Sequence, residues 1–443
     1  MQEQAIRPDS FARFVDEERG LIERKIFVDE DIYQQELQKI FGRCWLYLAH
    51  ESEVPNRGDF VSLYMGEESV ILCRGPNGKL SAFINSCRHR GNRVCRTDRG
   101  NIRNFVCAYH GWSYNLSGEL IGVPGKKDLY HDEIDQNAFG LIPVAHIDSY
   151  NGLIFATFDP EAPPLEEFLG DMRWGLDIML GQGDLIAVGG VVRWTIEGNW
   201  KFAADNAIGD FYHGPWTHRS ALLAAHTGGS GAQAISKYVT SRELTGLTLI
   251  TEYGHGLNAD YTGENEVDWS SPLSAWRKDP SVVEHLGPVR SRIQRSNMNV
   301  FPNLFVNSGS RDLMIRHPRG PNKMEIWKTV LVDRNADPEV QRLQVQASNR
   351  HFGPAGMFEQ DDGENWSQST EGARGVISQD YPLHYAMALG KEEFITEAGS
   401  PPFINTLTNE HAQLWMYKCW SEYMDAENWP ELIKNHSSPG RRV

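Results

Sequence analysis

Apolar side chains recur with two different periods along the chain, and the change of period divides it. Tyr33, Leu37, Ile40 and Phe41 have the spacing of one helical face, which predicts a short helix over residues 31–41. From 58 to 159 the pattern changes to short runs rich in β-branched and aromatic residues, separated by turns that contain glycine and asparagine. We expect an all-β module there.

Beyond residue 158 helical patterns alternate with paired strands. Apolar residues on one face of 165–179, after Pro163 and Pro164, predict one helix. Residues 297–306, 312–318 and 323–333 have the pattern of strands, and a turn at 319–323 joins the last two. We therefore predict an α+β protein. Its all-β domain covers 40–157, and 1–39 with 158–443 form a second domain, in which helices cover a mainly antiparallel sheet.

Composition and charge exclude some classes of binding partner. The 443 residues include 43 Lys and Arg against 59 Asp and Glu, a formal net charge of −16, with no basic block that could neutralise phosphates. The longest aliphatic runs fall short of the roughly 18 residues of a transmembrane helix. The charged N-terminal segment lacks the apolar stretch of a secretory signal. We expect a cytoplasmic protein that binds neither nucleic acid nor membranes.

Two Cys-His pairs stand in the β module. Cys87 and His89 are followed, after 17 residues, by Cys107 and His110. Four such ligands suit either Zn²⁺ or a [2Fe–2S] cluster with its cysteines on one iron and its histidines on the other. Each loop supplies one ligand of each kind, which favours the cluster over zinc. Four such residues at this spacing also argue against two core cysteines with two satisfied histidines. The other four cysteines are expected to fill the core, and these are Cys44, Cys73, Cys95 and Cys419.

A second set of ligands lies in the other domain. Asn206, Asp210 and His213 are spaced i, i+4 and i+7, so on a helix they share a face. We expect that helix to break at Gly214-Pro215 and to bring His218 back towards His213. Two imidazoles need a carboxylate to hold Fe(II), and residues 352–366 offer Asp361 and Asp362. Taken alone, this segment could equally be a solvated acidic helix start, and the histidines ordinary ones.

Together these segments resemble the large (α) subunits of Rieske non-haem iron aromatic-ring-hydroxylating dioxygenases. Three motifs occur in the same order: C-R-H-R-G-N…C-x-Y-H-G-W-S-Y, N-W-K-x-x-x-[DE]-N-x-x-G-D-x-Y-H…H and G-P-A-G-x-F-E-x-D-D-x-E-N. With both domains included, the resemblance spans nearly the whole chain. The resemblance implies a catalytic domain of the helix-grip, TBP-like type. It also implies a Rieske [2Fe–2S] cluster on Cys87, His89, Cys107 and His110, and a mononuclear Fe(II).

The resemblance further assigns roles to single residues. His213, His218 and Asp362, rather than Asp361, would be the iron ligands. Asp210 would be the bridging aspartate, hydrogen-bonded to His213 and to His110 of a neighbouring subunit, and Asn206 would lie close to the iron without being firmly bound. The expected wall of the substrate cavity consists of Asn206, Ala207, Gly214, Phe352 and Phe358.

The implied activity is that of a terminal oxygenase that inserts both atoms of O₂ into an aromatic hydrocarbon to give a cis-dihydrodiol. Electrons from NAD(P)H would come through a separate reductase or ferredoxin, since the chain has no GxGxxG or flavin unit and no second cluster. The implied assembly is an α₃ trimer, or α₃β₃ with a small β subunit.

Three alternatives stay open from the sequence. The first is a ring monohydroxylase. The second is an enzyme for an aromatic carboxylic acid, because an arginine could reach a carboxylate. The third is an electron carrier or zinc-stabilised binding protein without chemistry in 158–443. The arginines considered are Arg292, Arg295, Arg311 and Arg316.

Overall fold

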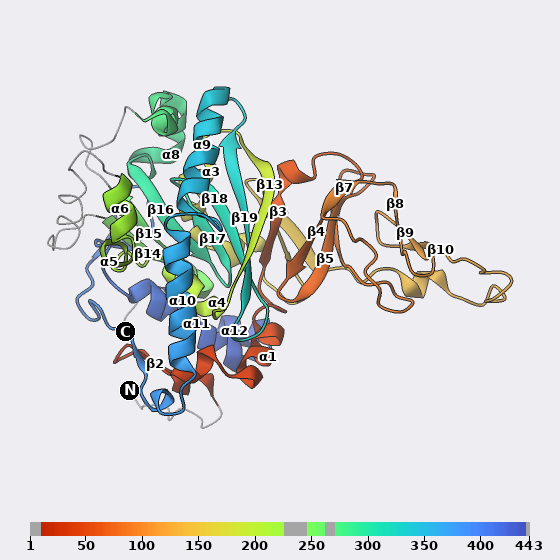
Figure 1. The fold of residues 1–443 in the computed structure, drawn as a ribbon, viewed down its shortest axis with the longest axis horizontal. Helices are drawn as coiled ribbons and strands as arrows, with labels where there is room; N and C mark the ends of the chain where they lie inside the picture. The colour runs from red at the N-terminus through yellow and green to blue at the C-terminus, as the bar shows by residue number, and fades with distance from the viewer. Residues whose placement is uncertain (1–9, 226–245, 262–270, 440–443) are drawn as a thin grey trace. The chain divides into compact units, whose positions relative to one another are not determined.

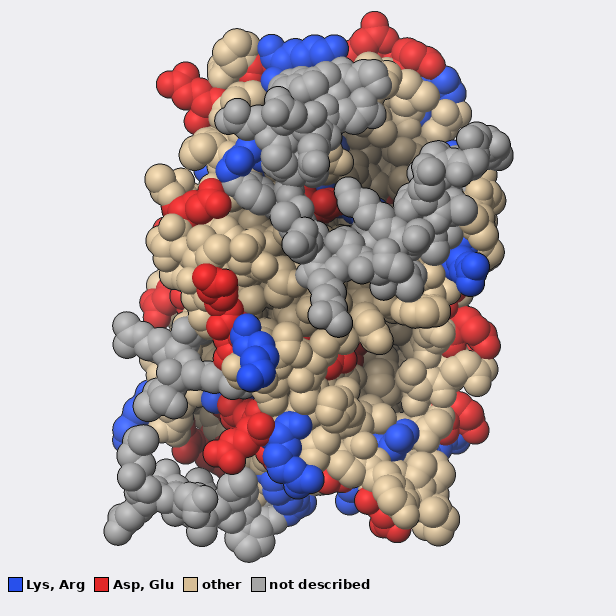
Figure 2. Space-filling view, turned by 90° about the vertical axis from the view of Figure 1, so that its left-hand side faces the viewer, with Lys and Arg blue, Asp and Glu red and all other residues tan. Residues whose placement is uncertain are grey.

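The computed structural model describes residues 10–225, 246–261 and 271–439. The chain forms two compact units: Phe41–Leu165, and Met1–Ile40 together with Glu166–Val443. Among the described residues, no helix has the length and apolar character needed to span a membrane. On the face drawn in Figure 2, the basic and acidic side chains that can be seen are interspersed.

The smaller unit consists of short antiparallel strands, as the sequence predicts (Figure 1). One sheet has the order β6-β5-β4-β7, a second β11-β12-β3 and a third β10-β9-β8. Their bounds are β3 Leu46–His50, β4 Asp59–Met65, β5 Glu68–Arg74, β6 Leu80–Ile84, β7 Arg99–Asn101, β8 Asn104–Val106, β9 Ser113–Asn115, β10 Leu120–Gly122, β11 His146–Tyr150 and β12 Leu153–Thr157. The third sheet carries the loop that holds Cys107 and His110 between β8 and β9.

The four cysteines outside the Cys-His pairs are all buried, which confirms the expectation that they fill the core. Cys73 and Cys95 belong to the hydrophobic cluster of the smaller unit, which also contains Cys87 and Cys107. Cys44 and Cys419 are fully buried, and none of the six cysteines forms a disulfide. Cys87 and Cys107 are therefore held by packing in this hydrophobic cluster.

The larger unit is built on one nine-stranded sheet whose paired neighbours are antiparallel, in the order β13-β19-β18-β17-β16-β15-β14-β22-β21. The predicted antiparallel α+β architecture is confirmed, and residues 319–323 do connect β18 to β19. The strand bounds are β13 Leu185–Ile196, β14 Gly246–Ile250, β15 Gly256–Tyr261, β16 Ile293–Val300, β17 Leu304–Asn307, β18 Asp312–Pro318, β19 Met324–Asp333, β21 Phe394–Ile395 and β22 Phe403–Ile404.

Helices pack against this sheet. In Figure 1, α9 and α10 run in front of its central strands, and α3, α4, α9 and α11 each contact at least one strand. The predicted N-terminal helix is present as α1. The helix bounds are α1 Glu30–Lys39, α2 Leu165–Leu169, α3 Met172–Leu180, α4 Trp200–Ala207, α5 Gly214–Thr217, α6 Arg219–Ala225, α8 Pro280–Arg290, α9 Pro338–His351, α10 Glu359–Ala373, α11 His411–Asp425 and α12 Trp429–Asn435.

The single helix predicted over 165–179 is wrong. The structure has two helices there, α2 and α3, separated at Gly170. Gly170 adopts φ +47°, and a Cβ at this position would lie 2.0 Å from Oε2 of Glu252, which accepts a hydrogen bond from the Asp171 N–H. Only glycine fits this turn, so the apolar face continues across a break in the backbone.

A buried ion pair anchors α4, the helix that leads into the ligand segment. Lys201 Nζ lies 2.5 Å from Oε1 of Glu36 on α1, and the indole N–H groups of Trp200 and Trp420 also donate to this carboxylate. All four side chains are at most 1% exposed. Burial lowers the pKa of Lys201 and the Glu36 carboxylate opposes that shift. Removing one partner would leave an unpaired buried charge, so this contact fixes α4 against α1 and α11.

Candidate metal centres

The segment with Asn206, Asp210 and His213 is not one helix, contrary to the sequence prediction. The helix α4 ends at Ala207, and Gly209 follows with φ +123°. Pro215 does not break a helix but begins one, because it occupies the first turn of α5, where its missing N–H costs nothing. His213 precedes α5 and His218 follows it. One short helix thus separates the two histidines and brings their rings together.

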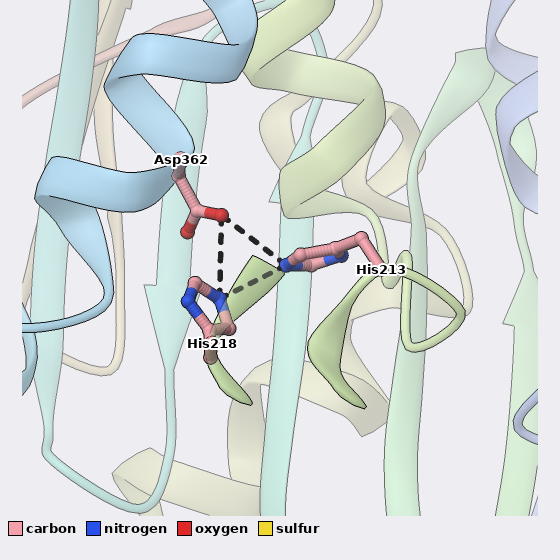
Figure 3. A group of neighbouring side chains, drawn as sticks. All are labelled: His213, His218 and Asp362. Atoms are coloured by element: carbon pink, nitrogen blue, oxygen red, sulfur yellow. Dashed lines mark hydrogen bonds and ion pairs between the residues drawn. The ribbon is translucent and has the colours of Figure 1, made fainter. Parts of the chain in front are cut away.

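Three donor atoms converge at this point (Figure 3). His213 Nε2 and His218 Nε2 are 3.1 Å apart, and Asp362 Oδ1 lies 3.2 Å from the first and 3.3 Å from the second. Asp362 comes from α10, so the third donor reaches the site from 144 residues further along the chain than His218. Side-chain exposure is 20% for His213, 10% for His218 and 8% for Asp362.

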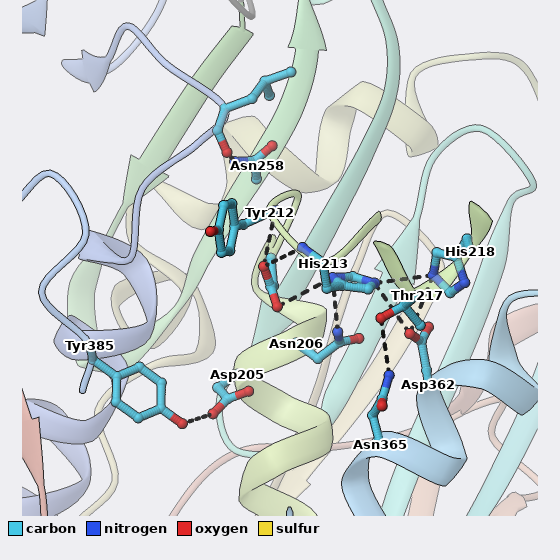
Figure 4. A network of polar contacts seen from close by, with 12 residues as sticks. Asp205, Asn206, Tyr212, His213, Thr217, His218, Asn258, Asp362, Asn365 and Tyr385 are labelled. Atoms are coloured by element: carbon cyan, nitrogen blue, oxygen red, sulfur yellow. Dashed lines mark hydrogen bonds and ion pairs between the residues drawn. The ribbon is translucent and has the colours of Figure 1, made fainter. Parts of the chain in front are cut away.

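The other nitrogen of each histidine contacts a carboxylate. Figure 4 shows the polar network around His213, with Asn206 beside its ring. His213 Nδ1 lies 3.2 Å from Asp210 Oδ2, and His218 Nδ1 lies 3.2 Å from Asp361 Oδ2. Asp210 also accepts hydrogen bonds from the backbone N–H groups of Tyr212 and His213 at 3.1 and 3.3 Å. A proton held on Nδ1 by a carboxylate leaves the Nε2 lone pair free to bind a cation.

The electrostatics of the three donors suit a cation. Burial alone would lower the pKa of His213, but Asp210 and Asp362 raise it to about 10. Burial alone would raise the pKa of Asp362, but His213 and His218 lower it to about 2. The cluster therefore attracts positive charge between these groups, as protons when nothing else is bound.

A mononuclear iron fits this donor set. Asp362 Oδ1 is buried and makes no hydrogen bond with another described residue, although both Nε2 atoms lie beside it. Two neutral imidazoles and one carboxylate on one side of an ion leave the opposite coordination positions open, as in the facial triad of non-haem iron oxygenases. The orphaned oxygen thus points to a metal as the missing partner.

The two Cys-His loops of the smaller unit share one backbone pattern. The N–H of Cys87 donates to the Asn92 carbonyl, and the Gly91 N–H donates back to the Cys87 carbonyl, each at 2.9 Å. In the second loop Cys107 bonds Trp112 and Gly111 bonds Cys107 in the same way, at 2.8 and 2.9 Å. Gly91 and Gly111 both adopt positive φ, +70° and +74°. The loops are therefore two copies of one ligand-presenting turn.

The side chains of these loops face one another. The ring centroids of His89 and His110 are 4.5 Å apart, and His89 stacks on Trp112 at 5.0 Å. Nδ1 of His89 is buried and makes no hydrogen bond within the described part of the chain. Burial works to raise the pKa of Cys107, but hydrogen bonds from the Tyr109 backbone and neighbouring groups lower it overall. Thiolate character and an orphaned imidazole nitrogen fit a [2Fe–2S] cluster with mixed ligands.

Comparison with known proteins identifies the family. Residues 168–426 match the model of the ring hydroxylating alpha subunit (catalytic domain), and 44–141 match the Rieske [2Fe-2S] domain. The α subunit of biphenyl dioxygenase from Paraburkholderia xenovorans (strain LB400) is 36% identical over 448 residues, which cover 96% of this chain and 95% of that relative. The chain belongs to the Rieske ring-hydroxylating oxygenases.

Other members of this oxygenase family agree in sequence and in fold. The large oxygenase component of the naphthalene 1,2-dioxygenase system of Pseudomonas aeruginosa is 34% identical, with 94% of each chain covered. A crystal structure of naphthalene 1,2-dioxygenase with indole in its active site matches with a TM-score of 0.87 at 32% identity, covering 95% of this chain and 96% of that one.

The protein is thus the large subunit of a Rieske non-haem iron aromatic-ring-hydroxylating dioxygenase. As an oxygenase of this family it carries a Rieske [2Fe–2S] cluster and a mononuclear iron, and it works with a reductase or ferredoxin on aromatic substrates and O₂. A stand-alone electron carrier or zinc-stabilised binding protein does not explain the match over 168–426.

Two of the five predicted cavity residues of this oxygenase contact the histidines, namely Asn206 and Phe358. Asn206 Nδ2 is 3.4 Å from His213 Nδ1, and the Phe358 ring is 4.7 Å from the His218 ring. Ala207 is buried at 2% exposure, whereas a Cβ on Gly214 would have no neighbour within 4 Å. The Phe352 ring contacts Phe305 on β17 instead, at 5.5 Å.

Two contacts of these centres were missed from the sequence. From the sequence, Asp361 is only a rival to Asp362, yet it contacts the second nitrogen of His218. The sequence assigns no role to Tyr114, but its hydroxyl lies 3.2 Å from Sγ of Cys87 and accepts a hydrogen bond from the Arg88 N–H. The spacing of Tyr114 within the Y-H-G-W-S-Y motif was the available signal, but nothing in it shows which way the ring turns.

Proposed function

We propose that His213, His218 and Asp362 hold the mononuclear iron, and that Cys87, His89, Cys107 and His110 hold the Rieske cluster. The observation that supports the first set is the approach of three donor atoms from separate elements to within 3.3 Å of one another. On this assignment residues 40–157 act as the Rieske domain, and 1–39 with 158–443 as the catalytic domain.

The proposed reaction is the insertion of both atoms of O₂ into an aromatic hydrocarbon to give a cis-dihydrodiol, with electrons from NAD(P)H. Two observations support it: relatives at about 35% identity are named for biphenyl, naphthalene and 2,4-dinitrotoluene, and the Phe358 ring lies 4.7 Å from the His218 ring. When bound, the two metal groups supply single electrons and open positions for O₂ activation.

In this reaction the residues around the iron site keep protons on the histidine Nδ1 atoms and orient the substrate. Asp210 keeps the proton of His213 on Nδ1 and so directs Nε2 towards the metal. Asp361 does the same for His218. Phe358 offers an apolar ring beside His218, against which a flat substrate can stack, and Gly214, which has no side chain, leaves open space around its Cβ position.

A hydrocarbon is favoured over an aromatic acid because the four candidate arginines already have partners or lack access. Arg292 pairs with Glu397 at 3.4 Å, and Arg295 lies 3.6 Å from Asp260. Arg311 donates to Gln182, and Arg316 is 2% exposed between the rings of Phe305 and Trp366. Ring monohydroxylation is the second candidate, since the same donor set supports it.

We further propose that subunits pack head to tail as an α₃ trimer, or as α₃β₃ with a small β subunit, in the cytoplasm. Asp210 would then bridge His213 and His110 of the next subunit. Its side chain is 34% exposed, so it retains free surface for such a contact.

The test uses protein purified without oxygen and supplied with a reductase, ferredoxin and naphthalene or biphenyl under ¹⁸O₂. We expect about three irons and two sulfides per chain and a cis-dihydrodiol with two ¹⁸O atoms. A product with one ¹⁸O would establish monohydroxylation instead. Zinc without sulfide, and no oxygenated product from any aromatic compound, would overturn the proposal.

A further inference from the structure

A buried pair of opposite charges lies beneath the segment that joins α9 to α10. We propose that Lys328, held by Asp312, is a positioning residue for this segment, residues 352–358, and thereby for the aromatic wall and the carboxylate of the iron site. The inference rests on the proposed function for its meaning in substrate selection. Neither residue belongs to a ligand motif.

The ammonium group of Lys328 contacts three oxygen atoms. Its Nζ lies on β19, 3.4 Å from Asp312 Oδ1 on β18, and donates hydrogen bonds to the Phe352 carbonyl at 3.0 Å and to Asn349 Oδ1 at 3.3 Å. Phe352 is the residue at which α9 ends, so its carbonyl has no partner within the helix. The ammonium group therefore closes the end of α9.

Burying the charges of Lys328 and Asp312 costs free energy, which indicates that the pair has a role other than stabilising the fold. The side chains of Lys328 and Asp312 are 2% and 0% exposed. Burial lowers the pKa of the lysine and raises that of the aspartate. Apolar side chains of similar size would stabilise such a site as well or better, but could not donate to a carbonyl. The charged pair thus provides a fixed donor at one point of the backbone.

A short series of backbone hydrogen bonds and ring contacts connects the Phe352 carbonyl to the proposed iron site. Gly353 follows with φ +109°, and the Met357 and Phe358 N–H groups return to the Arg350 and His351 carbonyls at 2.8 and 3.1 Å. The Phe358 ring then stacks on His351 at 5.2 Å and reaches His218 at 4.7 Å.

The same path ends on the carboxylate donor. The Asp362 N–H donates to the Phe358 carbonyl at 3.0 Å in the first turn of α10. Moving the Phe352 carbonyl therefore shifts both the ring that faces the substrate and the carboxylate that faces the metal. We expect Lys328 to influence which ring position of the substrate is oxidised and how long iron is retained.

The test compares Lys328→Met with the double variant Lys328→Met/Asp312→Asn, and with Lys323→Met as a matched control. Lys323 pairs with Glu197 on the surface just before the same strand and does not touch the segment. The single variant leaves a buried carboxylate unpaired, whereas the double variant removes both charges. Thermal midpoint, loss of iron to a chelator and the ratio of product isomers are measured for each.

We expect the single variant to lose stability and the double variant to regain it. In both, iron loss is faster and the isomer ratio changes, each about fivefold, the factor that corresponds to one hydrogen bond of about 1 kcal/mol. Recovery of iron retention and isomer ratio together with stability in the double variant would overturn the positioning role. So would unchanged values in both variants.

Iron loss needs no substrate, so it separates this inference from the proposed function. Wild-type protein that binds no iron at His213, His218 and Asp362 would overturn the proposed function, and this inference with it. Wild-type protein that retains iron and oxidises the substrate, with both variants behaving like Lys323→Met, would overturn this inference alone.

Discussion

A histidine that binds a metal through one nitrogen is oriented by the contact at its other nitrogen, and the two histidines of the proposed iron site differ in that contact. The Nδ1 of His213 contacts Asp210, whose carboxylate also holds two backbone N–H groups and is therefore fixed in place. The Nδ1 of His218 contacts Asp361, for which no such backbone contact is found in the described chain. Asp210 is thus the more rigid of the two partners.

Replacement of Asp362 by alanine should remove the mononuclear iron alone. Its carboxylate is the sole anionic donor of the three, and its loss leaves only the two imidazoles at either end of α5. We expect the iron content to fall from about three to about two per chain, with the EPR spectrum of the reduced Rieske cluster unchanged. Retention of all the iron would contradict the ligand assignment.

Replacement of Asp210 by alanine should separate metal binding from turnover. The donors themselves remain, but Nδ1 of His213 loses its carboxylate. We expect both metals to stay bound and product formation to fall about 100-fold, the range seen when partners of metal-bound histidines are removed. Iron content is measured together with product formation in the presence of reductase. Near-normal turnover would exclude the bridging role.

Tyr114→Phe should make the Rieske cluster harder to reduce. The hydroxyl lies 3.2 Å from Cys87 Sγ, and a hydrogen bond to a ligand sulfur stabilises the more negative, reduced cluster. One hydrogen bond of about 1 kcal/mol corresponds to a potential lower by ~40 mV for one electron. Redox titration followed by EPR measures it; phenylalanine at this site with an unchanged potential would show that the hydroxyl does not reach the cluster.

The proposed ligands could be singled out from the sequence by their chemistry, whereas residues that act through geometry could not. Two Cys-His pairs and a His-His-Asp set have few other uses, so their spacing is informative. Lys328 and Asp312 lie inside ordinary strand patterns, and only the structure shows that they meet beneath Phe352. A tyrosine such as Tyr114 gives no sign in one sequence of which way its hydroxyl points.

At the scale of elements, the strands and helices followed the hydrophobic period, and the errors came where glycine or proline redirects the backbone. The break at Gly170 and the end of α4 before Gly209 both depend on a positive φ. At each glycine, a side chain from a distant strand or turn also occupies the space that a Cβ would need. This side chain is Glu252 at Gly170 and Asn258 at Gly209. A local pattern cannot report contacts with residues that are tens of positions away.

Gly209→Ala should disrupt the iron site, and Gly214→Ala should not. A Cβ on Gly209 would lie 1.9 Å from the Cβ of Asn258, whose amide is held by Thr248 and the Leu407 carbonyl. A Cβ on Gly214 meets nothing within 4 Å. We expect the first variant to lose most of its mononuclear iron and several degrees of thermal midpoint, while the second matches the wild type. Equal behaviour of the two would contradict the strained turn.

At the scale of the whole molecule, one chain carries two metal groups on two compact units, and the proposed assembly decides which pairs of groups exchange electrons. Head-to-tail packing would make every active centre a product of two chains. A chain with only one of its two metal groups intact could then still take part in catalysis, provided that a neighbouring chain supplied the other group.

Mixed assemblies test this arrangement. A chain with Cys87→Ser lacks the cluster, and a chain with Asp362→Ala lacks the iron, so each alone should be inactive. Co-expressed in equal amounts, they should regain about a quarter of wild-type activity, because one in four neighbouring pairs joins an intact cluster to an intact iron site. The control mixes the two after separate assembly. No recovery on co-expression would place electron transfer within one chain.

The matching turns around Cys87 and Cys107 bear on how the protein matures. Each turn is closed by backbone hydrogen bonds that involve no metal, and the cysteines are packed in a core of apolar residues. The turns therefore have a backbone framework of their own, in addition to any contact with the cluster. We expect this framework to form in the same way whether iron and sulfide arrive during synthesis of the chain or after it.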